Sequence, residues 1–212
     1  MQTIVGVLRG GPSCEHEVSL KTGAAILANL PSDRYVARDI YIDKSGQWHE
    51  RGKPTSPERV LRQIDVALIG LHGEYGEDGE VQRLLELFGV PYAGSDSFGS
   101  YLAMHKLMAK TRAKEAGLLT PEFRHIERVE DSEAIVRDVI QNFSQPVIVK
   151  PVGWGSSVGV SVVGGYVPVL AAVEELFAKG ASNVLIEEYI RGKEATVGVV
   201  EGLRGEALYA LP

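Results

Sequence analysis

The fold is decided by the stretch TIVGVLRGGP, residues 3–12, in which a short apolar and β-branched run ends in a glycine-rich turn. Such a run predicts a buried strand, and the glycines and the proline predict the turn that ends it. Apolar residues then recur at helical spacing from Val18 to Leu30, which predicts a helix. Further strands are predicted at residues 36–42, 66–70 and 90–93. Because strands alternate with helices, residues 1–100 are predicted to form one α/β domain around a parallel sheet.

Two glycine-rich loops follow strands of this domain. They span residues 9–13 and 71–79, and the second leads into a predicted helix whose apolar face runs from Val81 to Phe88. Parallel sheets bind their ligands beyond the carboxyl ends of their strands. These loops are therefore the first place to expect a ligand.

The pattern changes after residue 100. A basic helix predicted from Tyr101 to Ala116 opens a second, α+β domain, residues 101–191. Its helices are predicted at 132–142 and 169–179, and its strands at 147–151, 160–163 and 184–188. Residues 194–200 and 207–210 are predicted to be the first strands of a third unit, residues 192–212. Two strands without a partner helix cannot bury their faces, so we expect the chain to be truncated after Pro212.

Composition narrows the class of protein. The chain has 212 residues, 44% hydrophobic and 24% charged, with a net charge of −6 and a pI of about 5.4. A net negative surface repels phosphate backbones, so nucleic acid is not expected as a partner. The single cysteine, Cys14, is expected to be a small packing residue and fits a reducing cytosol. No apolar run approaches the ~18 residues of a membrane span, and residues 1–8 lack the features of a signal peptide.

The segment from Lys150 to Val160, KPVGWGSSVGV, carries the strongest chemical signal. A lysine ends an apolar strand, and a loop with three glycines and two serines follows. Glycines let backbone N–H groups approach a phosphate, and a nearby ammonium supplies charge. The functional interpretation is a loop that folds over ATP phosphates; the alternative is a β-hairpin with a wide Gly/Ser turn.

Other single residues also have two interpretations. Glu187 and Glu188 end an apolar strand. In the functional interpretation, this segment binds an adenine edge and Glu194 binds ribose. In the alternative, these residues are solvated acids at the end of a strand. Lys106 can contact phosphate or lie on the surface. Glu15, near a helix start, can hold a substrate ammonium or act as a cap. His72 can contact a substrate carboxylate or phosphate, or can be a polar group at a strand end.

Taken in order, these segments resemble the D-alanine–D-alanine ligases, a family of the ATP-grasp superfamily. The segment GGPSCEHEVS, residues 10–19, resembles the first signature of the family, and LHG with GEDG, residues 71–79, resembles the second. The remaining motifs follow in the family order: PYAGS at 91–95, the Lys106 helix, KP with GSSVG within 150–159, EEYI at 187–190, and Glu194. The resemblance covers essentially the whole chain.

The resemblance implies a fold and a reaction. The fold would be a Rossmann-like N-terminal domain, a central ATP-grasp domain and an incomplete C-terminal ATP-grasp domain. ATP would bind between the last two, and its γ-phosphate would go to the carboxylate of a first D-alanine. A second D-alanine would attack the acyl phosphate, and the dipeptide would enter peptidoglycan precursors in the cytoplasm.

The resemblance also implies residue roles. Glu15 would hold the ammonium of the first D-alanine, with His72 near its carboxylate. Lys106 and Lys150 would neutralise phosphate charge. Ser156 would orient the site through hydrogen bonds that include Glu15. Nucleotide contacts would come from Gly155, Ser156 and Ser157 at the phosphates, from Glu187, Glu188 and Ile190 at adenine, and from Glu194 at ribose.

Two departures from the family pattern stand out. Gly153 and Trp154 replace residues that are polar or charged in many relatives, which makes Trp154 a candidate lid. The ligands for Mg²⁺ (or Mn²⁺) and the arginine of the tetrahedral intermediate are expected outside this chain, so the chain alone is predicted to be inactive. D-Alanine–D-lactate ligase and a non-catalytic nucleotide-binding remnant remain alternatives. A homodimer is implied by the family alone.

Overall fold

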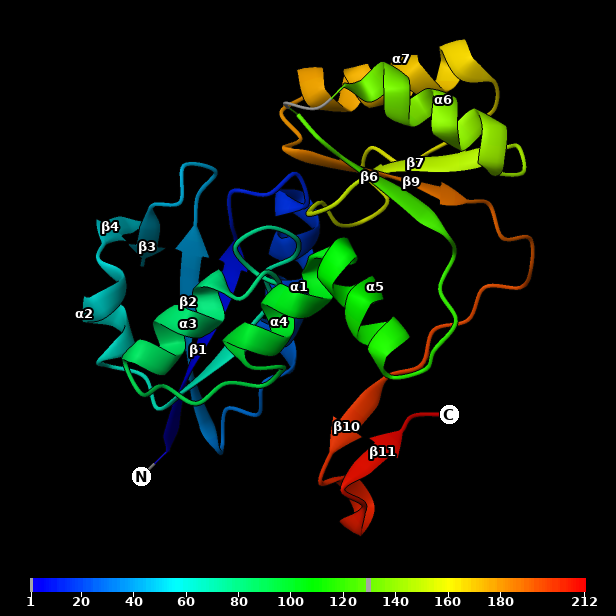
Figure 1. Ribbon diagram of the computed structural model, residues 1–212. Helices are drawn as coiled ribbons and strands as arrows, with labels where there is room; N and C mark the ends of the chain where they lie inside the picture. Colours follow the sequence, from blue (N-terminus) through cyan, green and yellow to red (C-terminus); the bar gives the residue numbers. More distant parts are fainter. Residues whose placement is uncertain (1, 129–130) are drawn as a thin grey trace.

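The computed structural model describes residues 2–128 and 131–212, which form three separate sheets (Figure 1). A five-stranded sheet uses the first third of the chain, a four-stranded sheet the middle, and a two-stranded hairpin the last residues. Helices α4 (Ser97–Met104) and α5 (Lys106–Glu115) connect the first sheet to the second. The protein is therefore of mixed α/β class, as predicted.

The five-stranded sheet has the order β4-β3-β2-β1-β5. Its strands are β1 (Thr3–Gly10), β2 (Tyr35–Ile42), β3 (Trp48–Glu50), β4 (Lys53–Thr55) and β5 (Val66–Ile69). The pairs β1–β2 and β1–β5 are parallel, which confirms the predicted parallel core. The antiparallel edge strands β3 and β4 were not predicted from the sequence, because they are too short to show a periodic pattern.

Helices cover both faces of this sheet (Figure 1). They are α1 (His16–Asn29), α2 (Pro57–Leu61) and α3 (Glu80–Leu87). Side chains alternate along β1, so Leu8 enters the core with α2 and α3 while Arg9 lies against Gly23 of α1. This packing places the two loops that end β1 and β5 at the same edge of the sheet.

Two sequence predictions in this region are wrong. Residues 90–93 form no strand, since only an isolated bridge joins Tyr92 to Ala67. The helix predicted from Tyr101 to Ala116 is two helices, α4 and α5, which meet at an extended His105. The His105 ring nitrogen accepts from the Met108 N–H at 3.4 Å, so this residue caps α5 and interrupts a run with otherwise favourable helix formers.

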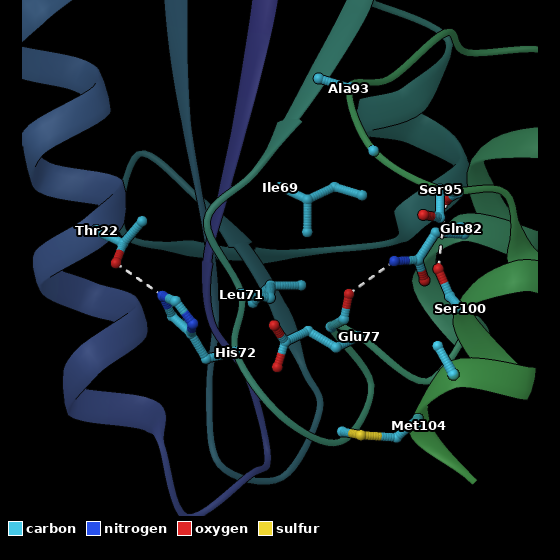
Figure 2. Close-up of a pocket in the computed structure, with 13 residues that line it drawn as sticks. Thr22, Ile69, Leu71, His72, Glu77, Gln82, Ala93, Ser95, Ser100 and Met104 are labelled. Atoms are coloured by element: carbon cyan, nitrogen blue, oxygen red, sulfur yellow. Dashed lines mark hydrogen bonds between the residues drawn. The ribbon is translucent and has the colours of Figure 1, made fainter. Parts of the chain in front are cut away.

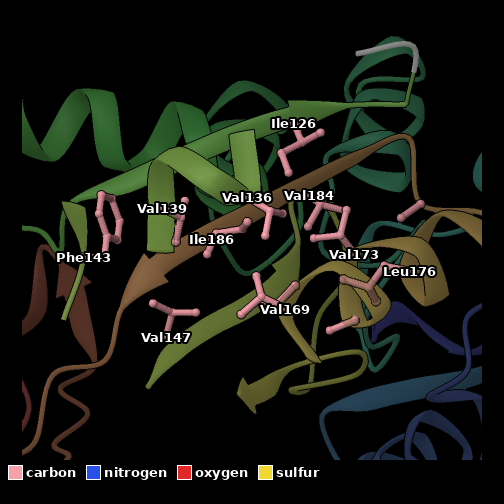
Figure 3. Close-up of a cluster of buried hydrophobic side chains, with 13 residues drawn as sticks. Ile126, Val136, Val139, Phe143, Val147, Val169, Val173, Leu176, Val184 and Ile186 are labelled. Atoms are coloured by element: carbon pink, nitrogen blue, oxygen red, sulfur yellow. The ribbon is translucent and has the colours of Figure 1, made fainter. Parts of the chain in front are cut away.

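The four-stranded sheet is antiparallel, with the order β6-β9-β7-β8. Its strands are β6 (Phe123–Glu127), β7 (Val147–Pro151), β8 (Ser161–Val163) and β9 (Asn183–Glu188). Helices α6 (Ser132–Asn142) and α7 (Tyr166–Ala178) lie side by side on one face, over a core that includes Val149 and Ile186. Figure 3 shows this core between the helices and the sheet.

The last residues form a hairpin of β10 (Val199–Glu201) and β11 (Leu208–Ala210), joined by a short helix, η1 (Leu203–Gly205). The prediction of a strand over residues 194–200 is therefore largely wrong. Figure 1 draws the hairpin clear of both sheets, and the side chains of Val199 and Leu208 are exposed. Among the described residues, no helix is both long and apolar enough to cross a membrane.

Candidate functional site

Lys150 and Glu187 face each other on the side of the second sheet that α6 and α7 leave open. Val147 and Val149 of β7 point into the core, so by alternation Lys150 points to the opposite face. Glu187 on β9 does the same, because its neighbour Ile186 is in the core. The Lys150 ammonium lies 2.7 Å from Glu187 Oε2, and Glu187 is only 4% exposed. The sheet register thus places a buried ion pair directly below the glycine-rich loop.

The glycine-rich loop connects β7 to β8 through an unusual backbone. Ser156 and Ser157 have φ of 51° and 58°, in the left-handed region that non-glycine residues rarely adopt. Gly159 has φ of 74°, and a Cβ there would lie 2.8 Å from a Leu176 methyl carbon. Strained backbone of this kind clusters at functional sites, where the surrounding structure holds it in place. The loop is therefore a specifically shaped segment rather than a plain hairpin turn.

A hydrogen bond joins this loop to the turn that follows strand β1 of the first sheet. The Ser156 hydroxyl donates to Glu15 Oε1 at 2.5 Å, although 141 residues separate the two in sequence. Glu15 is held by the turn after β1, where its N–H donates to Ser13 Oγ at 3.1 Å. Ser13 Oγ in turn donates to the carbonyl oxygen of His72 at 2.6 Å. The loops that end β1, β5 and β7 therefore meet at Glu15.

Lys106 fastens the start of α5 to the same loop. Its ammonium donates to the carbonyl oxygen of Trp154 at 2.5 Å, and its backbone N–H donates to that of Val152 at 3.2 Å. Burial lowers the pKa of Lys106, the nearby charge of Lys150 lowers it further, and Glu187 partly offsets both. Two lysines thus lie near one another beneath the loop, and an anion there relieves their repulsion.

His72 and Glu15, predicted to contact one substrate, line different cavities. His72 lines a cavity of about 510 Å³ at the edge of the first sheet, where its Nε2 lies 2.8 Å from Thr22 Oγ1 (Figure 2). Gln82 lines the same cavity, and its buried Oε1 has no partner among the described residues. Glu15 lines a second cavity of about 280 Å³, together with Trp154.

The predicted adenine and ribose residues are not gathered around one cavity. Glu188 and Ile190 line a hollow of about 430 Å³, and Glu188 Oε2 accepts from the Glu122 N–H at 3.1 Å. Glu187 instead faces the lysines, and Glu194 is exposed beyond the end of β9. The structure therefore brings Glu15, Lys106, Lys150, Ser156 and Glu187 together, with Gly155 and Ser157 in the same loop, but leaves the ribose contact apart.

Three further observations concern residues that the sequence singled out or missed. Trp154 packs against the core of the second sheet, so its ring is anchored there. Cys14 is exposed, and the prediction that it packs inside is wrong. The sequence predicts Lys110 only as a member of a basic helix. In the structure its ammonium lies 3.2 Å from Glu187 Oε1. Its spacing of four residues from Lys106 was the signal that could have found it.

The described residues contain no group of three or more His, Cys, Asp or Glu side chains placed to hold a metal ion. Of the acids near the loop, Glu15 accepts from Ser156 and Glu187 pairs with lysines. The part of the chain that the structure describes therefore does not fit a magnesium site, and no chemical step is assigned to a metal.

Together, the two sheets and the glycine-rich loop between β7 and β8 define an ATP-grasp protein. Residues 4–59 and 49–95 match the family model described as D-ala D-ala ligase N-terminus, and residues 113–210 match D-ala D-ala ligase C-terminus. The chain belongs to the D-alanine–D-alanine ligase family.

Individual relatives agree with this assignment. The D-alanine–D-alanine ligase of Geobacter sulfurreducens is 40% identical over 211 residues, which are 99% of this chain and 62% of that protein. The structure of the D-alanine–D-alanine ligase from Coxiella burnetii matches with a TM-score of 0.85 at 26% identity, covering 99% of this chain and 69% of that one. The Bacillus anthracis enzyme complexed with ATP matches with a TM-score of 0.72 at 33% identity, covering 90% and 60%. The chain thus spans 62% of the length of the Geobacter relative.

Proposed function

We propose that the protein is a D-alanine–D-alanine ligase, which joins two D-alanines with ATP through a D-alanyl phosphate. The observation that carries the proposal is the hydrogen bond between Ser156 and Glu15. It places a carboxylate suited to an amino-acid ammonium against a loop suited to phosphates. The ATP-bound Bacillus relative supports a nucleotide at this fold. By the same resemblance, the proposed setting is peptidoglycan precursor synthesis in the cytoplasm.

The first proposed step is phosphoryl transfer. Glu15 holds the ammonium of the first D-alanine by a charge-assisted hydrogen bond. A carboxylate oxygen of this D-alanine forms a bond to the γ-phosphorus of ATP, and the bond from that phosphorus to the bridging oxygen of ADP breaks. Lys106 and Lys150 offset the negative charge of the transferred group, while N–H groups of residues 153–159 cover it. Exclusion of water protects the acyl phosphate from hydrolysis.

The second proposed step forms the peptide bond. The amine of a second D-alanine attacks the acyl carbon, its proton is lost, and inorganic phosphate leaves. Adenine and ribose are assigned to the strand end at Glu187, Glu188 and Ile190 and to Glu194, as the family resemblance implies. Because the described residues lack a metal cluster, the Mg²⁺ that the family implies is given no ligand here.

A homodimer is also proposed on the family resemblance. Light scattering measures the molar mass that tests this proposal.

The test is product analysis on the whole reading frame that contains these 212 codons, supplied with ATP, Mg²⁺ and D-alanine. We expect one D-alanyl-D-alanine for each ADP released, measured by mass spectrometry and a coupled assay. Glu15→Gln is expected to lower kcat/KM for the first D-alanine at least about tenfold, because it removes one charge-assisted hydrogen bond. ADP release without dipeptide, or faster ester formation with D-lactate, would show that the acceptor assignment is wrong.

A further inference from the structure

The carboxylate of Glu187 is shared between two lysines from different elements. Its Oε2 lies 2.7 Å from Lys150 Nζ on β7, and its Oε1 lies 3.2 Å from Lys110 Nζ on α5. Glu187 is 4% exposed, and a carboxylate buried to this degree persists only when it is paired. Each oxygen therefore lies within ion-pair distance of its own ammonium, although Oε1 accepts no hydrogen bond from the described residues.

Lys110 is held firmly in this position. Its side chain is 10% exposed, and its ammonium lies 5.0 Å from the centroid of the Phe123 ring. Phe123 on β6 lies directly opposite Glu187 on β9 in the sheet register. Since Lys110 is also one helical turn after Lys106, α5 presents both lysines to the same open face of the sheet.

The charges of this cluster do not balance. Lys110 and Lys150 both pair with the single carboxylate of Glu187, and the Lys106 ammonium is close enough for the charges of Lys150 and Glu187 to act on it, so the excess charge is positive. If Lys110 were absent, both oxygens of Glu187 would be available to Lys150. That pair would be neutral and tightly closed, and the ammonium would be less available to another anion.

We propose that Lys110 is a positioning residue, which occupies the far oxygen of Glu187 and thereby leaves Lys150 able to bind the phosphates of a nucleotide. The inference rests on the proposed nucleotide site and adds a residue to it. Lys110 keeps Glu187 neutralised when Lys150 turns to a phosphate, so no buried carboxylate is left unpaired during the exchange.

The first measurement is calorimetric binding to the product of the whole reading frame that contains these 212 codons, because the family resemblance places ATP between the central and C-terminal units. The ligands are inorganic tripolyphosphate, ATP and adenosine. Lys110→Met is expected to weaken tripolyphosphate and ATP about tenfold, the effect of one charge-assisted hydrogen bond, and to leave adenosine unchanged. Lys110→Arg, which keeps the charge, is expected to restore most of the affinity. Equal losses for adenosine and ATP would mean a general structural role and would overturn the proposal.

A matched control lies one turn further along α5. Lys114 is also 5.1 Å from the Phe123 ring, but it pairs with Glu122 at 3.5 Å and is half exposed. Lys114→Met therefore removes the same charge and the same ring contact without touching Glu187. It is expected to bind tripolyphosphate like the unmodified chain, and a loss equal to that of Lys110→Met would contradict the inference. If Lys110→Met does not fold, Lys110→Gln serves in its place.

A double-mutant cycle separates action through Glu187 from direct attraction of phosphate. In a Glu187→Gln background the shared carboxylate is gone. Lys110→Met should then change tripolyphosphate affinity less than about twofold, because the interaction it controls is already absent. An equal loss in both backgrounds would show that Lys110 attracts phosphate itself.

A second measurement needs no ligand. Acetic anhydride reacts with the free amine, so a lysine whose ammonium is held more firmly by a carboxylate reacts more slowly. Lys110→Met is expected to slow the labelling of Lys150 several-fold, as measured by peptide mass spectrometry, and an unchanged rate overturns the inference. If the product of the whole reading frame binds neither ATP nor tripolyphosphate, the proposed nucleotide function fails, while the labelling rates still decide the role of Lys110.

Discussion

At the scale of single residues, the candidate site depends on pairs that no local pattern reveals. Glu15 and Ser156 are both visible in the sequence as parts of motifs, but their hydrogen bond exists because two sheets bring distant loops together. The ion pair between Lys150 and Glu187 forms for the same reason, because strand register and side-chain alternation place both residues on one face of the second sheet. A residue's chemistry here is set by its partner more than by its neighbours in sequence.

The Ser156 hydroxyl is predicted to hold the glycine-rich loop in its strained conformation. Ser156→Ala removes the donor to Glu15 and leaves φ near 51° without that support. We expect faster amide hydrogen exchange over residues 153–159, by about tenfold for one lost hydrogen bond. Ser157→Ala, at φ of 58° in the same loop but without the hydrogen bond to Glu15, serves as the control. Unchanged exchange in the alanine variant would show that the bond does not order the loop.

At the scale of elements, the carboxylate of Glu86 connects helices α3 and α4, which lie between the two sheets in sequence. From the end of α3 it accepts from the Ser97 N–H at 2.9 Å and the Ser97 hydroxyl at 2.6 Å, at the start of α4. Tyr92 donates its hydroxyl to the same carboxylate at 2.6 Å. The hydrogen bonds from Ser97 and then Tyr92 lower the pKa of Glu86 below its usual value of 4.5.

These hydrogen bonds to Glu86 predict that the free energy of unfolding depends on pH. A carboxyl whose folded-state pKa is lowered stabilises the fold above its unfolded pKa, and the contribution is lost as the pH falls through the folded value. Glu86→Gln should therefore lower the melting temperature at pH 7, by a few degrees at most because the group is exposed. The difference from the unmodified chain should shrink as the pH drops below 4.5. Thermal unfolding at a series of pH values measures this, with the exposed Glu58→Gln as control; a pH-independent difference would contradict it.

At the scale of the whole molecule, the two large sheets have separate cores. One core contains Leu8, Ile40 and Trp48, and the other contains Val149 and Ile186 (Figure 3). The loops at Glu15 and Ser156 and the helices α4 and α5 connect the two sheets. Connections of this kind transmit less stability than a shared core, so each sheet is expected to unfold as its own unit.

Ile186→Ala is predicted to destabilise the second sheet alone. The side chain is fully buried, and its truncation leaves a cavity that costs about 2–5 kcal/mol. In urea, the transition of the second sheet should shift while that of the first sheet stays in place. The fluorescence of Trp48 reports on the first sheet in a Trp154→Phe background, because Trp154 packs against the core of the second sheet. Val200→Ala in the exposed hairpin should change either transition by less than about 0.5 kcal/mol. A shift of both transitions by Ile186→Ala would show a single cooperative unit.

Local sequence patterns were enough to predict the elements with strong periodicity, the α/β class and the motif residues of the candidate site. Helix α1, strands β1, β2, β7 and β9, and the glycine-rich loop were all predicted, because apolar alternation and glycine turns are local properties. The family resemblance also came from short motifs in a fixed order. Prediction ended where the signal was short: β3, β4, β6 and α2 were missed, and residues 90–93 lacked the partners that make a strand.

The packing of the two sheets determines which of these side chains come into contact. The break at His105 turns α5 so that Lys106 reaches the glycine-rich loop and Lys110 reaches Glu187. Packing also directed the His72 ring to Thr22, into a cavity that Glu15 does not line. The physical reason is that hydrogen bonds and ion pairs depend on distances of about 3 Å between side chains far apart in sequence, and those distances exist only after the sheets have packed.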